Sequence, residues 1–140
     1  MSFPMEPGSE KAPPPRVLIV MDEQWPRALL RAAMLEAGYD AVGARSLAEA
    51  LGYPAKDPDR GPVRLVIVDD HAVKGDGVPS ITLVLSRHGN PATLLLARAT
   101  QSVPEGPWQR VLRRPCSVGD IVAAVRDLLP PASTSSGSVD

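Results

Sequence analysis

Two adjacent carboxylates end a continuously apolar stretch near the middle of the sequence. Residues 65–68 read Leu-Val-Ile-Val, and Asp69 and Asp70 follow directly, before a glycine-rich segment at residues 75–77 that we expect to be a turn. One interpretation is a reactive acid at the carboxyl end of a buried strand, because open parallel sheets bind ligands at that edge. The alternative is a strand that leaves the core at a turn, where aspartates are common. The choice depends on the elements that surround this pair.

Short apolar runs alternate with helical patterns along the chain. Continuous runs rich in β-branched residues are typical of strands buried on both faces. We expect strands at residues 17–21, 39–44, 65–68, 93–97 and 110–113. Helical spacing of apolar residues and capping patterns predict the helices. These are expected at residues 26–37, from Ser46 to 51, at 81–85 and from Ser117 to 128.

This alternation predicts an α/β fold, a doubly wound five-stranded parallel sheet with strand order 2-1-3-4-5. Residues 98–108, between the fourth and fifth strands, are few and contain Pro104, Gly106 and Pro107. We therefore expect the fourth helix, in this connection, to be shortened or lost. The crevice of this topology lies beyond the first and third strands. It places Asp22, which follows the first strand, beside Asp69.

Composition limits the protein classes that fit the chain. With 140 residues, 44% of them hydrophobic, it suits one domain. We expect that domain at residues 16–129, between disordered tails at residues 1–15 and 130–140. Fifteen Lys and Arg against sixteen Asp and Glu give no argument for a nucleic-acid or membrane partner. Cys116 is the only cysteine and no apolar run approaches the length of a membrane span, so we expect a cytoplasmic protein.

Residues 16–51, RVLIVMDEQWPRALLRAAMLEAGYDAVGARSLAEAL, resemble the opening of a bacterial response-regulator receiver domain of the CheY-like type. In that family an Asp-Gly pair follows the phosphoacceptor aspartate by seven and eight residues. Counting from Asp69 reaches Asp76 and Gly77, whereas counting from Asp70 does not. The resemblance therefore implies that Asp69 is the phosphoacceptor.

The resemblance also implies a metal ion and a basic residue. Attack of a carboxylate on a phosphoryl group brings like charges together, and Mg²⁺ offsets that repulsion. By resemblance, its ligands are Asp22, Asp69 and the backbone carbonyl of His71. Arg114 precedes a proline, where the family has a lysine, and the Arg114–Pro115 peptide bond is expected to be cis. Alternatively, Arg114 only neutralises the two acids as a structural ion pair.

Several positions depart from the family pattern. Met21 stands where the family has the first acid of a pair, which weakens the expected Mg²⁺ site unless Glu23 replaces that acid. Leu96 stands where the family has a Thr or Ser that bonds the phosphoryl group, unless Thr100 takes its place. Val111 replaces the aromatic residue of the family's switch. We therefore expect a degenerate receiver-like domain.

Two functions remain open. The first is single-domain signalling in a bacterial two-component system, in which Asp69 accepts a phosphoryl group from a histidine kinase or phosphotransfer protein. The alternative is a phosphorylation-independent pseudo-receiver, a module that binds a constitutive protein partner. Neither is an enzyme beyond self-phosphotransfer at Asp69. A nucleotide-binding enzyme is disfavoured because no glycine-rich loop follows the first strand. The sequence does not predict the oligomeric state.

Two further residues have open interpretations. Trp25, at the start of the first helix, either helps a partner dock or forms a hydrophobic staple with its own helix. Cys116 follows the proline of the fifth strand, and we expect it to pack as a small apolar residue.

Overall fold

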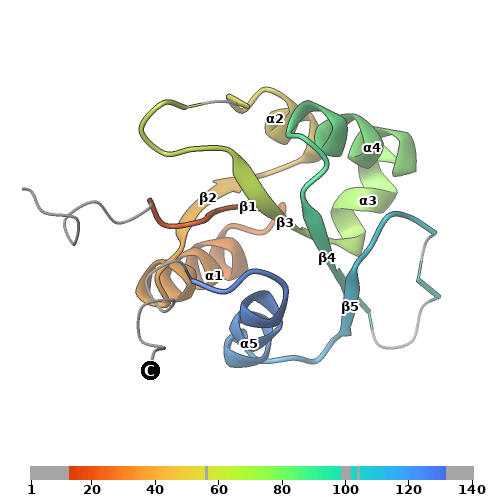
Figure 1. Ribbon diagram of the computed structural model, residues 1–140. Helices are drawn as coiled ribbons and strands as arrows, with labels where there is room; N and C mark the ends of the chain where they lie inside the picture. Colours follow the sequence, from red (N-terminus) through yellow and green to blue (C-terminus); the bar gives the residue numbers. More distant parts are fainter. Residues whose placement is uncertain (1–12, 56, 99–101, 104, 132–140) are drawn as a thin grey trace, which may run out of the picture.

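The computed structural model describes residues 13–55, 57–98, 102–103 and 105–131. They form one sheet between two layers of helices (Figure 1). The strands are β1 (Arg16–Val20), β2 (Asp40–Ala44), β3 (Val63–Asp69), β4 (Ala92–Ala97) and β5 (Arg110–Arg113). The helices are α1 (Gln24–Glu36), α2 (Leu47–Leu51), α3 (Asp70–Asp76), α4 (Val78–Arg87) and α5 (Val118–Leu128). The expected tails lie largely outside the described residues. Among the described helices, none combines the length and the apolar character needed to cross a membrane.

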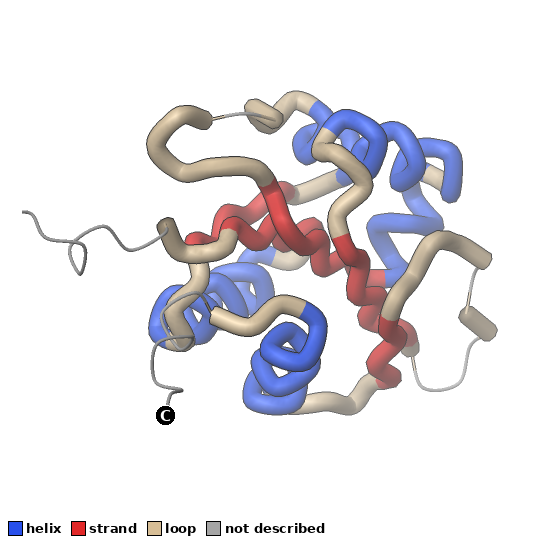
Figure 2. Tube along the Cα trace, viewed as in Figure 1, coloured by secondary structure: helices blue, strands red, loops and turns tan. Residues whose placement is uncertain are grey.

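The sheet has the predicted topology. All neighbouring strands are parallel, and their order is β2-β1-β3-β4-β5. Helices α1 and α5 cover one face, and α2, α3 and α4 cover the other (Figure 2). In the register of the central strands, Val20 lies opposite Val68 and Asp69 lies opposite Leu96. The strand order confirms the doubly wound fold, and the register brings the ends of β1, β3 and β4 to one edge.

Each face of the sheet has its own apolar core, because successive side chains of a strand point to opposite faces. Val17 and Ile19 pack with the residues of α1 and α5. Leu18 and Val20 pack with those of α2, α3 and α4. All these β1 side chains are fully buried. This two-sided burial explains why the strand reads as a continuous apolar run rather than as an alternating pattern.

The connection between β4 and β5 contains no helix in its described residues, 98, 102–103 and 105–109, as expected. Trp108 and Val103 pack instead against the core on the α2–α4 side. The Trp108 ring lies so close to Gly106 that a Cβ placed there would be 2.4 Å from it. A glycine at this position therefore lets the indole fold back over the backbone.

The segment that follows β3 differs from its expected form. The sequence favoured a glycine-rich turn and a short helix at residues 81–85, whereas the chain forms α3 directly after Asp69 and then the longer helix α4. The side chain of Asp69 caps α3, and Gly77, with φ +89°, separates the two helices. Pro79 lies in the first turn of α4, where its missing N–H leaves no helical bond unmade. The expected turn at residues 75–77 is thus confined to Gly77, because the helix that Asp69 caps continues through Asp76.

Candidate functional site

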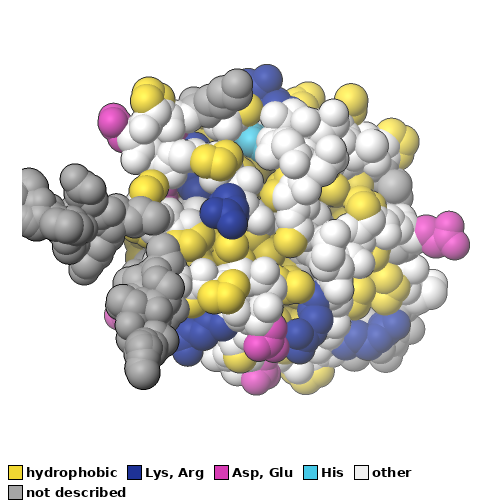
Figure 3. Space-filling view, in the orientation of Figure 1, with side chains coloured by type: hydrophobic (Ala, Val, Ile, Leu, Met, Phe, Trp, Pro, Cys, Tyr) yellow, Lys and Arg dark blue, Asp and Glu magenta, His cyan; other side chains and the backbone are white. Residues whose placement is uncertain are grey.

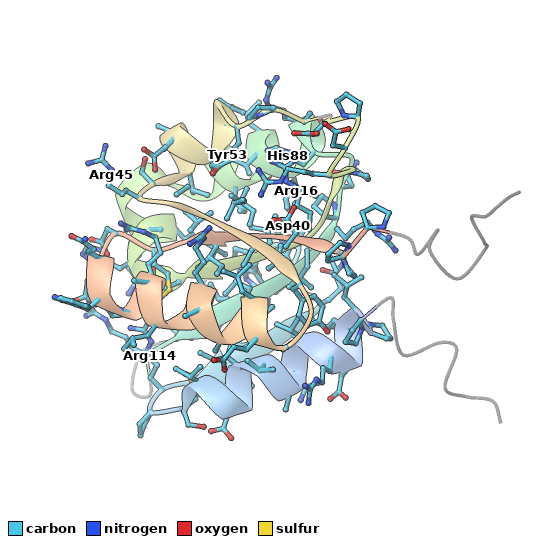
Figure 4. The ribbon with its side chains drawn as sticks, turned by 90° about the vertical axis from the view of Figure 1, so that its left-hand side faces the viewer. Arg16, Asp40, Arg45, Tyr53, His88 and Arg114 are labelled. Atoms are coloured by element: carbon cyan, nitrogen blue, oxygen red, sulfur yellow. The ribbon has the colours of Figure 1, made fainter. Side chains whose placement is uncertain are left out.

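A polar cavity of about 170 Å³, which we call the acid pocket, lies at the carboxyl edge of the sheet. Its lining residues are Asp22, Glu23, Asp69, Asp70, His71, Arg98 and Arg114. The structure thus brings together the four site residues that the sequence singled out, Asp22, Asp69, His71 and Arg114. It also places Glu23, the possible replacement acid, at the same pocket. Figure 4 shows Arg114 between α1 and α5.

Asp69 ends β3 and is almost fully buried, with 1% of its surface exposed. Its Oδ1 accepts a hydrogen bond of 2.9 Å from the backbone N–H of Ala72, which satisfies one of the free donors in the first turn of α3. Its Oδ2 lies 3.6 Å from Nη2 of Arg114. Both carboxylate oxygens therefore have a partner inside the domain.

Burial raises the pKa of Asp69 above its ordinary value of 3.8. The N–H of Ala72 and the charge of Arg114 oppose this shift, and the nearby Asp22 and Asp70 add to it. The two stabilising contacts thus do not compensate fully for the loss of water.

Arg114 follows β5 and is tied to the sheet edge by its backbone. Its N–H donates to the carbonyl of Ala97 at 2.8 Å, and the Arg114–Pro115 bond is cis, as expected. The guanidinium is the only described basic group within ion-pair distance of Asp69. This geometry matches the structural ion pair that the sequence left open for Arg114.

The side chain of Asp22 pairs with His71 rather than with a group at Asp69. Its Oδ2 lies 2.8 Å from Nδ1 of His71, the first-turn residue of α3, in a half-exposed pair. No sequence pattern predicts this contact, because the position of the His71 ring depends on α3 starting directly at Asp70.

Asp70 is a second buried acid that sequence reasoning set aside. It is 2% exposed, and its Oδ2 accepts a 3.0 Å hydrogen bond from the backbone N–H of Arg98, just after β4. Its Oδ1 is buried without a partner among the described residues. The contact holds the start of α3 to the end of β4. Two carboxylates in succession are therefore used to fix the same corner of the sheet.

Met21 and Leu96, the two apolar replacements, do not line the acid pocket. Both are buried in the core on the α1–α5 side, with 3% and 0% exposure. They line a separate apolar groove. Thr100, the alternative hydroxyl, lies outside the described residues. Neither the acid nor the hydroxyl expected from the family pattern is thus supplied at these two positions.

The side chains at the acid pocket do not fit Mg²⁺ in the arrangement they adopt. Mg²⁺ prefers octahedral oxygen ligands, usually including one or two carboxylates. Here Asp69 is engaged by Ala72 and Arg114, and one Asp22 oxygen is engaged by His71. His71 lies inside α3, where backbone carbonyls point toward the C-terminal end of the helix and away from its cap. No group of three His, Cys, Asp or Glu side chains within the described part of the chain is placed to hold a metal ion.

Comparison with known proteins identifies the fold. No protein-family model matches the sequence, and no curated protein matches it. Among solved structures, the signal receiver domain of an HD domain-containing protein from Pseudomonas fluorescens Pf-5 is 22% identical over 82% of this chain and 94% of its own, with a TM-score of 0.66. The receiver domain of Francisella response regulator 1452 is 18% identical over 81% of this chain and 95% of its own, also with a TM-score of 0.66.

A third solved structure, a response regulator from Burkholderia pseudomallei, contains a phosphorylated aspartic acid, a calcium ion and citrate. It is 20% identical over 79% of this chain and 65% of its own, with a TM-score of 0.64. These similarities establish that the chain has the fold of CheY-like receiver domains. The chemistry at the acid pocket depends on the residues that this chain places there.

Proposed function

We propose that this chain is a receiver-like signalling domain that acts by binding a protein partner, without phosphorylation. The observation that carries the proposal is the state of Asp69. Both of its carboxylate oxygens are engaged, one as the cap of α3 and one beside Arg114. An aspartate that holds a helix and an arginine in place has a structural role that does not require a phosphoryl group.

The other end of the expected switch supports the same proposal. Phosphorylation switches work when a local charge event biases an element with two alternative arrangements. Opposite Asp69 stands Leu96, which has no hydroxyl to respond to a phosphoryl group, and Val111 stands in place of the switch aromatic. The described residues of the β4–β5 connection contain no helix that could move. A charge added at Asp69 therefore has no evident element to bias.

Phosphotransfer to Asp69 from a histidine kinase or phosphotransfer protein is the second candidate. This candidate is favoured by one observation. Asp22, Asp69 and Arg114 line the same cavity, as the resemblance implies. It would require Asp69 to give up its contact with Ala72. Mg²⁺ would then have Asp22, Asp69 and the backbone carbonyl of His71 as ligands, which requires the first turn of α3 to open.

Amide NMR on the full chain distinguishes the two candidates. We would titrate Mg²⁺ to millimolar concentration and then add beryllofluoride, a phosphoryl mimic, with the Asp69→Asn variant as control. The asparagine side chain of this variant keeps a cap oxygen for Ala72 but cannot bind the mimic as a carboxylate. Our proposal predicts no saturable shift around Asp22, Asp69 and Leu96. Saturable shifts that vanish in Asp69→Asn would favour phosphotransfer and overturn the proposal.

A further inference from the structure

A mostly apolar groove of about 650 Å³ lies between the first turn of α1 and the start of α5. Some of its lining side chains are buried, among them Met21, Leu30 and Leu96. Others are left in water, since Trp25 is 76% exposed and Leu29, one helical turn later, is 59% exposed. Such exposure argues against Trp25 as a staple of its own helix, because a staple residue packs against that helix. Contiguous exposed apolar side chains around a concave surface are typical of a binding site.

Both ends of the described domain lie at the other end of the layer that α1 and α5 form. Before β1, the carbonyl of Pro15 accepts a hydrogen bond from the N–H of Asp40, which lies shortly after α1. After α5, Pro131 lies so close to the end of α1 that a Cβ placed on Gly38 would be 3.6 Å from its Cβ. Helix α1 runs from the groove to this end over 13 residues, which is a length of about 20 Å. A segment attached at either end of the domain must therefore cover about 20 Å to enter the groove.

Residues 1–12, which we call the N-terminal segment, lie outside the described residues and are long enough to cover this distance. At about 3.1 Å per residue in a polyproline conformation, the 12 residues from Phe3 to Pro15 reach about 37 Å. This reach exceeds the length of α1, so the Phe3 side chain can enter the groove without stretching the chain.

The composition of the N-terminal segment also matches the groove. Residues 1–7 read Met-Ser-Phe-Pro-Met-Glu-Pro, which combines large apolar side chains with prolines. Proline-rich segments bind to exposed aromatic side chains, such as that of Trp25, because their preformed conformation loses little entropy. At the other end of the chain, residues 132–140 read ASTSSGSVD, with Val139 as the only large apolar side chain. Of the two segments outside the described domain, the N-terminal one therefore fits the groove.

We propose that the N-terminal segment binds in this groove of its own domain, with the Phe3 side chain against Trp25 and Leu29. Because the segment belongs to the same chain, its effective concentration at the groove is high, and few contacts are enough to hold it. A segment that has no fold of its own can bind in this way. Bound there, it covers the exposed apolar side chains of α1 and excludes other molecules from them. This inference is independent of the proposed function.

Cys116, the only cysteine of the chain, makes a direct test possible. It packs against the core on the α1–α5 side, as expected, and it lines the groove while staying half-buried. In the full chain, Glu6→Cys places a second thiol three residues after Phe3. Equilibration of this variant with a glutathione redox buffer, followed by intact-mass measurement, gives the effective concentration of one thiol at the other. The comparison variants add Phe3→Ser or, as the matched control in the same segment, Ser9→Ala.

We expect Phe3→Ser to lower this effective concentration about tenfold, since burial of one phenylalanine side chain favours binding by about that factor. Ser9→Ala should leave it unchanged, and Trp25→Ala should lower it as Phe3→Ser does. A second readout is the indole N–H signals of the chain without the added cysteine. Phe3→Ser should shift the signal of Trp25 and leave that of Trp108, which packs on the opposite face of the sheet, in place.

Three results would overturn the proposal. The effective concentration is the same with and without Phe3, or Phe3→Ser leaves the Trp25 signal in place, or the disulfide forms between two chains instead of within one. The last of these results would mean that the groove takes the N-terminal segment of a second copy.

Discussion

The two halves of the sheet's carboxyl edge differ in what they keep of the receiver pattern. At the ends of β1 and β3, Asp22 and Asp69 are present and have structural partners, His71 for one and Ala72 with Arg114 for the other. On β4 and β5 the corresponding positions are apolar, with Leu96 buried and Val111 half-buried. In this chain Asp69 thus caps a helix at an edge of the sheet where Leu96 and Val111 present no polar group.

On the face seen in Figure 3, Lys and Arg side chains and Asp and Glu side chains both appear among apolar and neutral ones, in agreement with the formal net charge of −1. We therefore expect the effect of a substitution at the carboxyl edge on stability to depend on its local contacts rather than on the net charge of the protein.

The largest effect is expected from Met21→Asp, which restores the missing acid. Met21 is 3% exposed in an apolar cluster, so an ionised side chain there would be buried without a partner. We expect a loss of about 3 kcal/mol or more in the free energy of unfolding, measured by urea denaturation. Met21→Leu, the size-matched control, should lose less than about 1.5 kcal/mol. A Met21→Asp protein as stable as the control would mean that the side chain reaches the acid pocket.

A smaller loss is expected from Leu96→Thr, which restores the missing hydroxyl. Leu96 is fully buried among apolar side chains, so threonine would remove packed methyl groups and add a polar group. We expect a loss of about 2 kcal/mol in the free energy of unfolding, against about 1 kcal/mol for Leu96→Val. Equal losses for the two variants would show that the hydroxyl finds an acceptor, and that this half of the edge is less apolar than its residue types indicate.

The cap of α3 should contribute less to the free energy of unfolding than the packing of Met21 or Leu96. Asp69→Ala removes the acceptor for the N–H of Ala72, and we expect a loss of about 1 kcal/mol, read from the midpoint of urea unfolding. Asp69→Asn keeps an acceptor oxygen and should stay close to the wild-type protein. If the alanine variant is no less stable than the asparagine variant, the cap is not what holds Asp69 in place.

The smallest effect concerns pH. Because burial raises the pKa of Asp69 above 3.8, the folded state holds this proton more tightly than the unfolded state. The contribution of Asp69 to stability is therefore full below pH 3.8 and is lost as the pH rises through the raised value. Compared with Asp69→Asn, the wild-type protein should lose stability from about pH 4 upward and then level off. The opposite slope would mean that Arg114 outweighs burial and lowers the pKa.

Most of the fold could be predicted from the sequence. Apolar runs separated by helical patterns require parallel strands covered on both faces, and the right-handed crossover leaves few strand orders. The meeting of Asp22, Asp69 and Arg114 follows from that order, since all three stand at the carboxyl ends of strands.

The contacts on which the proposed function rests could not be predicted from the sequence. The pairing of Asp22 with His71 and the burial of Asp70 both depend on a helix that starts immediately after Asp69. The glycines at residues 75 and 77 favour a turn in this segment, so the sequence does not predict that helix. Arg16, the first residue of the expected domain, is 1% exposed. Its Nη1 donates to the carbonyl of Gly61, and its guanidinium lies 5.9 Å from the Tyr53 ring centre, as the labelled side chains in Figure 4 help to show. Such pairings depend on three-dimensional neighbours and leave no periodic signal.

The central claim is that Asp69 is a structural residue and not a phosphoacceptor. Incubation of the full chain with acetyl phosphate and Mg²⁺, followed by intact-mass measurement beside the Asp69→Asn variant, tests it most directly. We expect that neither protein gains a phosphoryl group. A phosphoryl adduct on the wild-type chain that is absent from Asp69→Asn would contradict this claim.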